Sequence, residues 1–290
     1  MCHVAGYVAA MSDLSDLLDA LDLAPADGGF VAGHVTEGGA PVVFGGQLLA
    51  QAAVAATRSA EGKQLTSLHT VFARAARPDA PLHIDLDPMH AGRAFASTTV
   101  TIRQEGKLCA RSIALLHVPD DDLLRHAAER PDAGRPEDWA PRTDGGLWDL
   151  RTADDVDLAD PTVGPPELLV WARFPDAPSD PVIGQALLAY ASDGFLIGTA
   201  LRPAAGLGQA DAHVRISTTV LTQTITFHEP VDASQWLLLA HRSTYAGRGR
   251  SYGQADVWSG DTLVASFVQE NMIRAFPPGA APAPGGRAAH

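Results

Sequence analysis

One carboxylate in the second half of the chain, Asp193, stands where the first half has an apolar residue. Setting the run "LLAQ" at residues 48–51 on the run "LLAY" at residues 187–190 places Asp193 opposite Val54. A carboxylate that takes a proton from a reactant is a general base, and it needs a position within hydrogen-bond reach of that proton. Asp193 is therefore a candidate base, although a hydrogen-bonding role at a helix end is the simpler interpretation of an Asp beside Ser and Gly.

An amide, Gln269, breaks the match between the halves in the same way. Setting Ala110 on Ala265 places Gln269 opposite Ala114. Burying an unpaired polar group costs about 1–3 kcal/mol, and the simpler interpretation of Gln269 is a strand-end residue that faces water. A protein that carries two copies of one unit needs only one working site, so reactive residues are expected to differ between the copies. The two differences together favour a site in the second half.

The elements that position these residues follow from an internal repeat. The run "VFGGQLLAQAAVAA" (residues 43–56) has a weaker twin in "GQALLAYASDG" (residues 184–194), and strand-like segments with turn signals follow each run. Both halves then show a corner of Pro, Asp and Ala, a Gly-Arg pair that enters an alternating strand, and a glycine turn into a last strand. These features lie at residues 78–80 and 230–233, at 92–93 and 249–250, and at Gly106 and Gly260.

The first of these runs has almost no polar face, because only Gln47 and Gln51 are polar between residues 47 and 56. A surface helix normally carries a charged face, so this helix is expected to be buried, with other parts of the protein on all sides. A twisted antiparallel sheet with one apolar face can wrap a single helix. We therefore expect helices at about residues 45–58 and 183–198, each wrapped by the strands of its own half.

This order of segments resembles the acyl-CoA thioesterase II family, the TesB-like double hotdog thioesterases. The resemblance covers roughly residues 11–276 and rests on the motifs "VFGGQLLAQAAVAA", "GRAFASTTVTIRQEGKL", "YASDGFL", "FHEP", "QWLLLAHRS", "GRGRSYGQADVW" and "LVASFVQENMIR". It implies an α+β double hotdog, in which two antiparallel sheets, each wrapped around a central helix, are joined by a linker.

The domain organisation that we predict has five parts. The segment between the two hotdogs is charged and proline-rich, which is typical of a surface connection, and the end of the chain has a biased composition of Pro, Gly and Ala. The parts are an N-terminal extension (1–10), an N-terminal hotdog (11–118), a linker (119–143), a C-terminal hotdog (144–276) and a disordered tail (277–290).

The resemblance also implies roles for individual residues. In the family, an Asp on the helix, a Gln on the last strand and a Thr or Ser on a strand between them hold and activate a water. The first two positions fall on Asp193 and Gln269, but the third falls on Val220, counted from the "FH" pair that follows. Because side chains two residues apart along a strand share a face, we expect Thr222 to supply the hydroxyl, with Thr218 as the alternative.

The mechanism that the resemblance implies is direct hydrolysis of a thioester. Asp193, ionised or nearly so, would take a proton from water, while Thr222 and Gln269 would fix the orientation of that water. Backbone N–H groups near Gly45 and Gly46, or in the turn before Asp193, would stabilise the thioester oxygen and so bind substrate. Close packing at a strand–helix turn explains the glycine pair equally well.

Composition limits the partners. The formal net charge of −13 argues against nucleic acid. Coenzyme A is anionic, and Arg248 and Arg250 are available for its phosphates, although a solvated strand end explains these arginines equally well. The two cysteines form neither a disulfide framework nor a zinc spacing, so no cofactor and no metal is expected. No apolar run is expected to span a bilayer, which takes about 20 residues.

The resemblance and the composition leave two functions open. The first is an acyl-CoA thioesterase of lipid metabolism that forms a homodimer or homotetramer. The second is a non-catalytic hotdog protein that binds acyl-CoA or an acyl carrier, because the Thr or Ser position is altered. The first residues lack the positive charge of a signal peptide, so a cytoplasmic location is expected for either.

Overall fold

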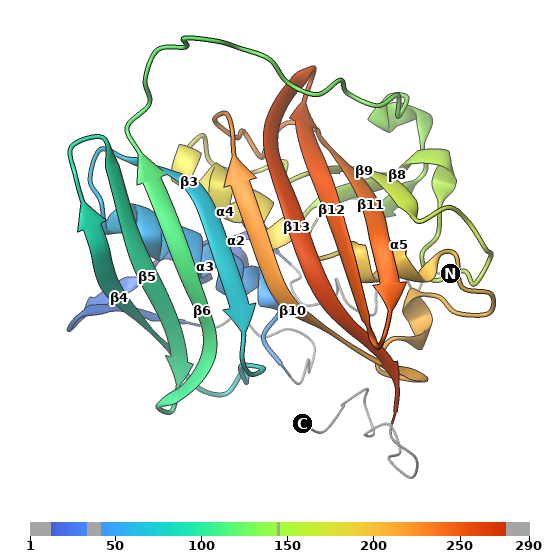
Figure 1. Cartoon of the computed structure of the whole chain (residues 1–290), viewed down its shortest axis with the longest axis horizontal. Helices are drawn as coiled ribbons and strands as arrows, with labels where there is room; N and C mark the ends of the chain where they lie inside the picture. Colours follow the sequence, from blue (N-terminus) through green and yellow to red (C-terminus); the bar gives the residue numbers. More distant parts are fainter. Residues whose placement is uncertain (1–12, 34–41, 144–145, 277–290) are drawn as a thin grey trace.

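The computed structural model describes residues 13–33, 42–143 and 146–276 (Figure 1). The expected N-terminal extension (1–10) and the expected disordered tail (277–290) lie outside these residues. The described strands form one antiparallel sheet of 13 strands, in the order β1-β2-β4-β5-β6-β3-β10-β13-β12-β11-β9-β8-β7. The first six strands in this order come from the N-terminal half of the chain and the last seven from the C-terminal half.

The strands of the N-terminal half are β1 (Ala24–Ala26), β2 (Gly29–Ala32), β3 (Gln64–Phe72), β4 (Leu82–Ala91), β5 (Phe95–Gln104) and β6 (Lys107–His117). Those of the C-terminal half are β7 (Pro141–Thr143), β8 (Asp149–Thr152), β9 (Glu167–Arg173), β10 (Ile216–Phe227), β11 (Leu237–Gly247), β12 (Arg250–Ser259) and β13 (Thr262–Ala275). The halves join where β3 pairs with β10, from Val71 opposite Thr222 to Ser67 opposite Thr226.

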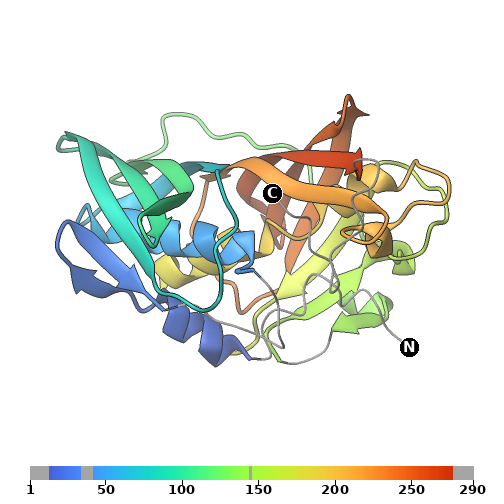
Figure 2. The same ribbon diagram turned by 90° about the horizontal axis from the view of Figure 1, so that it is seen from below.

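In the described part of the chain, four α-helices accompany the sheet: α2 (Leu14–Leu21), α3 (Gly45–Arg58), α4 (Pro181–Ala191) and α5 (Leu196–Leu201). Short 3₁₀ helices span Pro136–Asp138, Ala153–Asp155 and Gln209–Asp211. Helices α3 and α4 lie side by side on one face of the sheet (Figure 2), and α5 lies against β11 and β12 of the C-terminal half. This is the predicted double hotdog, and the expected first helix at residues 45–58 is confirmed.

Burial explains the apolar sequence of α3. Every residue from 46 to 56 is buried, because the sheet covers one side of the helix and α4 the other. Gln51, one of the two polar residues in this stretch, donates from Nε2 to the carbonyl oxygens of Ala20 (3.0 Å) and Gly33 (3.1 Å). A Cβ at Gly46 would lie 2.4 Å from the carbonyl oxygen of Tyr190, so glycine is what lets α3 approach α4 so closely.

The expected second helix at residues 183–198 is wrong in its bounds. Helix α4 starts at Pro181, where the carboxylate of Asp180 accepts hydrogen bonds from the N–H groups of Val182 and Ile183. It ends at Ala191, and α5 begins only at Leu196. The sequence Ser-Asp-Gly between them favours turns over helix. This interruption places Asp193 in a turn rather than within a helix.

The segment Pro181–Leu201 corrects a second expectation, that no run reaches the length of a membrane span. By length and composition it could cross a membrane, but 78% of its 18-residue apolar stretch is buried inside the fold. Packing under the sheet accounts for this hydropathy, as it does for α3.

The connection between the halves runs over the surface from β6 (Figure 1). Two arginines tie it to the C-terminal half: Arg125 pairs with Glu229 (2.6 Å) and Arg130 with Asp261 (3.2 Å). The last three residues of the expected linker, 141–143, form β7 at the edge of the sheet.

Candidate active site

Asp193 lies where the end of α4 meets the start of α3. Only 9% of its surface is exposed, and its carboxyl group accepts a hydrogen bond from the backbone N–H of Gly46. A Cβ at Gly45 would lie 2.7 Å from Oδ2 of Asp193. The glycine pair therefore lets the first turn of α3, with its unpaired N–H groups, approach the carboxyl group.

Gln269 reaches Asp193 from β13. Its Nε2 donates to Oδ1 of Asp193 (3.2 Å) and to Oε1 of Gln223 on β10 (2.7 Å). Gln223 and Gln269 are direct partners across the β10–β13 pair, and both are 1% exposed. The two residues expected from the comparison of the halves, Asp193 and Gln269, are thus brought together, and Gln223 joins them.

A chain of hydrogen bonds fixes which way the Gln269 amide points. The hydroxyl of Ser192 donates to the carbonyl oxygen of Ala189 (2.7 Å), so its oxygen is left to accept from Nε2 of Gln223. Oε1 of Gln223 then faces Nε2 of Gln269. Oε1 of Gln269 consequently points away from Gln223 and Ser192, and it is buried without a partner among the described residues. A carbonyl oxygen in this state can accept a hydrogen bond from a water or a substrate.

Burial raises the pKa of Asp193 to about 8, although the hydrogen bond from Gly46 opposes the shift. Loss of hydration disfavours the charged form, and the surroundings of the carboxyl group provide only hydrogen bonds to replace it. A pKa raised in this way favours the protonated form at neutral pH, in contrast to the ionised or nearly ionised Asp193 that the resemblance implied. The ionised fraction becomes large only near pH 8, which is a range suited to a general base.

The structure does not bring Thr222 to this group. The pairing of β10 with β13 shifts between Val220, opposite Asn271, and Thr222, opposite Glu270. This bulge at Leu221 moves Thr222 to the outer face of the sheet, away from Gln269. The alternation that was expected to keep Val220 and Thr222 on one face is lost at the bulge.

Two positions before the bulge remain on the inner face. Val220 lies there, so the position that departs from the family's Thr or Ser does belong to the site face but carries no hydroxyl. Thr218 is 2% exposed and lies within 3.4 Å of the ring of His213. It is farther along the strand from Gln269, since it stands opposite Ile273.

Gln223 and Ser192 are the residues that sequence reasoning missed. A signal for Gln223 existed in the repeat, because the pairing of Leu68 with Ala114 in the N-terminal half matches that of Gln223 with Gln269. Leu68 is apolar and buried, so Gln223 is a third polar replacement. Nothing in the sequence singled out Ser192. Of the two arginines expected near coenzyme A, Arg250 forms an ion pair with Glu270.

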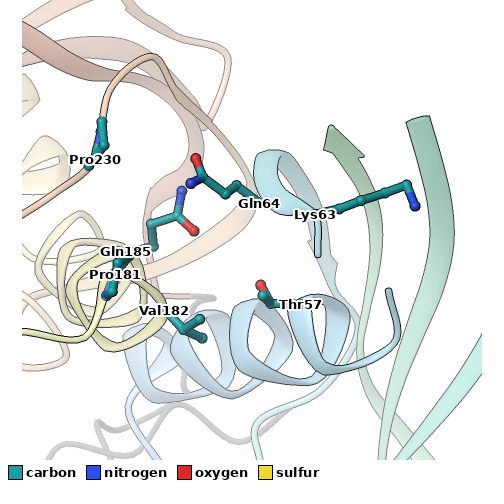
Figure 3. A pocket seen from close by; sticks show the side chains of 7 residues that line it. All are labelled: Thr57, Lys63, Gln64, Pro181, Val182, Gln185 and Pro230. Atoms are coloured by element: carbon teal, nitrogen blue, oxygen red, sulfur yellow. The ribbon is translucent and has the colours of Figure 1, made fainter. Parts of the chain in front are cut away.

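The opposite half offers a control for this site. There the end of α3 meets the start of α4, and a small pocket of about 40 Å³ lies between them, lined by Thr57, Lys63, Gln64, Pro181, Val182, Gln185 and Pro230 (Figure 3). Gln185 donates from Nε2 to the carbonyl oxygen of Leu65 (2.8 Å). The counterparts of Asp193, Gln223 and Gln269 are Val54, Leu68 and Ala114, so this second position lacks the carboxyl group and the two amides of the candidate site.

Comparison with known proteins decides the family. Residues 32–117 match the family described as acyl-CoA thioesterase N-terminal domain, and residues 121–273 match the acyl-CoA thioesterase C-terminal domain. The chain belongs to the acyl-CoA thioesterase family.

Individual relatives of this thioesterase-family chain agree with that assignment. It is 31% identical over 290 residues to acyl-CoA thioesterase 2 of Haemophilus influenzae, a match that covers 91% of this chain and 99% of the relative. It is 27% identical to acyl-coenzyme A thioesterase 8 of Homo sapiens, with 89% and 88% covered. The crystal structure of acyl-CoA thioesterase II TesB2 from Mycobacterium marinum is similar with a TM-score of 0.76 at 26% identity, covering 91% of this chain and all of that one.

Within the described ranges, no group of three or more His, Cys, Asp or Glu side chains is arranged to hold a metal ion. The polar groups that meet at Asp193 are one carboxyl group, two amides, one hydroxyl and one backbone N–H. Such a set can take up a proton and orient a water.

Proposed function

We propose that the chain hydrolyses acyl-CoA thioesters to a free acid and coenzyme A by direct attack of water. The observation that carries this proposal is the hydrogen-bonded group of Asp193, Gln269 and Gln223, present in one half and replaced by apolar residues in the other. Family membership supports the acyl-CoA substrate. The rival function, binding without turnover, has less support because a pKa near 8 is suited to proton transfer.

The proposed reaction has two steps. The Asp193 carboxylate takes a proton from water, while Oε1 of Gln269 accepts the water's other proton in a hydrogen bond, and the water oxygen attacks the thioester carbon. The tetrahedral intermediate then expels the sulfur, which receives the proton from Asp193 as coenzyme A thiol. No covalent enzyme intermediate forms. Holding the water in this orientation removes an entropic cost from the transition state.

Release of free thiol from a panel of acyl-CoA chain lengths tests this function. The expected result is saturable release with at least one chain length. Binding of acyl-CoA, measured by calorimetry, without release of thiol at any chain length would overturn the proposal in favour of the non-catalytic binding protein.

Gln223→Leu introduces the residue found at the equivalent position of the N-terminal half, Leu68. It removes the acceptor that orients Nε2 of Gln269, so we expect kcat to fall by about 10–100-fold, which corresponds to about 1–3 kcal/mol for a lost buried partner. KM is expected to change little, because Gln223 orients Gln269 rather than the substrate. Steady-state kinetics of both parameters measures this split.

Thr222→Val is the matched control for Gln223→Leu. Its side chain lies on the outer face, beside the half-exposed Val71, so kcat is expected to stay at the wild-type value. Loss of activity in Thr222→Val with full activity in Gln223→Leu would contradict the proposed arrangement and restore Thr222 as the source of the hydroxyl.

We further propose that the chain acts in the cytoplasm in lipid metabolism, as a homodimer or homotetramer. The free, buried thiol of Cys109 suits a reducing compartment. On the outer face of the N-terminal sheet, Val71, Ile113 and Leu115 are 45%, 49% and 38% exposed, and adjoining apolar side chains of this kind mark association surfaces. Light scattering is expected to give at least twice the chain mass of 30.4 kDa, and a monomer at micromolar concentration would contradict this assembly.

A further inference from the structure

Two more positions next to the site are polar in one half and apolar in the other. On the inner face, Ser251 of β12 pairs with Asn271 of β13. The corresponding pair in the N-terminal half is Ala96 with Leu116. All four residues are buried. The polar replacement at Gln269 thus continues along β13 to Asn271 and includes Ser251 on the neighbouring strand β12.

Asn271 has an unpaired buried acceptor. Its Nδ2 donates to the hydroxyl oxygen of Ser251 (3.2 Å), while its Oδ1 has no partner among the residues that the structure describes. The side chain is 0% exposed. An unsatisfied buried polar atom costs about 1–3 kcal/mol, and each one in a native protein calls for an explanation such as a bound ligand.

The fold itself does not need this amide. The same position in the N-terminal half is filled by Leu116, which is 0% exposed, so an apolar side chain satisfies the packing of an equivalent strand. Retaining Asn271 at a cost in stability therefore indicates a role outside folding.

The position of Asn271 connects it to the thioester. It is two residues from Gln269 on one strand, so both side chains point to the same face and their Cα atoms are about 7 Å apart. Oε1 of Gln269 and Oδ1 of Asn271 are both unpaired in the described structure. A thioester held against Gln269 extends in two directions, as the acyl chain and as the pantetheine arm. One of these two parts would therefore pass Asn271.

We propose that Asn271, held by Ser251, is a substrate-binding residue that accepts a hydrogen bond from an N–H or O–H group close to the thioester. This inference rests on the proposed hydrolysis of acyl-CoA. Oδ1 is an acceptor only, so the partner is a donor. Two parts of an acyl-CoA carry a donor within a few bonds of the thioester: the nearest amide of the pantetheine arm, and the hydroxyl of a β-hydroxyacyl chain.

Asn271→Leu, which copies Leu116, tests the inference with three thioesters of equal acyl length. They are a straight-chain acyl-CoA, the matching β-hydroxyacyl-CoA, and a simple alkyl thioester that has neither donor. We expect one ratio of kcat/KM values to fall by about 10–100-fold, the change expected for loss of one buried hydrogen bond. Ser251→Ala, which copies Ala96, should lower the same ratio by less, since it only frees the Asn271 amide.

The ratio that falls identifies the donor. A fall in the ratio of β-hydroxyacyl-CoA to straight-chain acyl-CoA assigns Asn271 to the acyl hydroxyl. A fall in the ratio of straight-chain acyl-CoA to the alkyl thioester, with the ratio of the two acyl-CoAs unchanged, assigns it to the pantetheine amide. Unchanged ratios, whether the three rates stay constant or drop together, would overturn the inference, because a structural residue or one that binds only water does not discriminate among these substrates.

A binding measurement separates this inference from the proposed function. In an Asp193→Asn background, calorimetry compares acyl-CoA and β-hydroxyacyl-CoA affinities with and without Asn271→Leu. Absence of turnover in the wild type would remove the proposed function, whereas affinities independent of Asn271 would remove only the inference. The thermal midpoint of Asn271→Leu should not fall below that of the wild type, since the variant removes an unsatisfied group.

Discussion

Asp193→Asn is expected to lower kcat for acyl-CoA hydrolysis by about 10²–10⁴-fold, the usual effect of losing a general base. Asparagine keeps the shape of the side chain and can still accept one hydrogen bond from Gly46 or Gln269, but it cannot take up a proton at neutral pH. KM should change little, because Asp193 acts on the water rather than on the acyl chain. Steady-state kinetics with thiol detection measures both parameters.

Asp180→Asn is the matched control for this variant. It makes the same substitution at the other end of α4, where the carboxylate caps the helix by accepting from Val182 and Ile183. Asparagine is as good an N-cap as aspartate, so fold and activity should be retained. Full activity in a folded Asp193→Asn protein would mean that Asp193 is only a helix-end residue and that the base lies elsewhere.

The second large effect is expected in the pH dependence of the wild-type enzyme. Because burial raises the pKa of Asp193 to about 8, the ionised fraction of the free enzyme falls about tenfold for each pH unit below 8. The value of kcat/KM, which reports groups of the free enzyme, should therefore rise about tenfold per unit up to pH 8 and then level off. Rates between pH 6 and pH 9.5, corrected for spontaneous hydrolysis, measure this profile.

Asp193→Asn supplies the control for the pH profile as well. Its residual kcat/KM, once corrected for the spontaneous reaction, should not show the rise that ends near pH 8. A wild-type profile that is already level at pH 6 would contradict the assignment, because it would require a base that is ionised at that pH.

Most of the fold could be predicted from the sequence, because the repeat and the apolar run of α3 are both consequences of burial. Asp193 and Gln269 could be found for the same reason: a polar residue opposite a buried apolar one is visible without coordinates. Gln223 was within reach of this comparison, since Leu68 is its counterpart. The bounds of α4 were missed because the helical pattern continues past residue 191 while the turn residues Ser192 and Gly194 interrupt it.

Other features of the site could not be predicted. The hydroxyl was assigned to Thr222 on the assumption that β10 alternates without interruption, and the bulge at Leu221 breaks that alternation. A bulge depends on how two strands pair, so one strand's sequence does not reveal it. The raised pKa of Asp193 could not be predicted either, because it depends on how completely the surrounding elements exclude water from the carboxyl group.

The burial of Asp193 links the chemistry of the site to the stability of the whole fold. In the unfolded chain this carboxyl group loses its proton near pH 4, whereas in the folded protein it keeps it up to about pH 8. Between these values Asp193 binds one more proton in the folded state than in the unfolded state, so this group alone lowers the free energy of unfolding by about 1 kcal/mol for each added pH unit. The pH at which Asp193 becomes ionised, and so able to act as a base, is therefore also a pH at which its burial no longer favours the folded state.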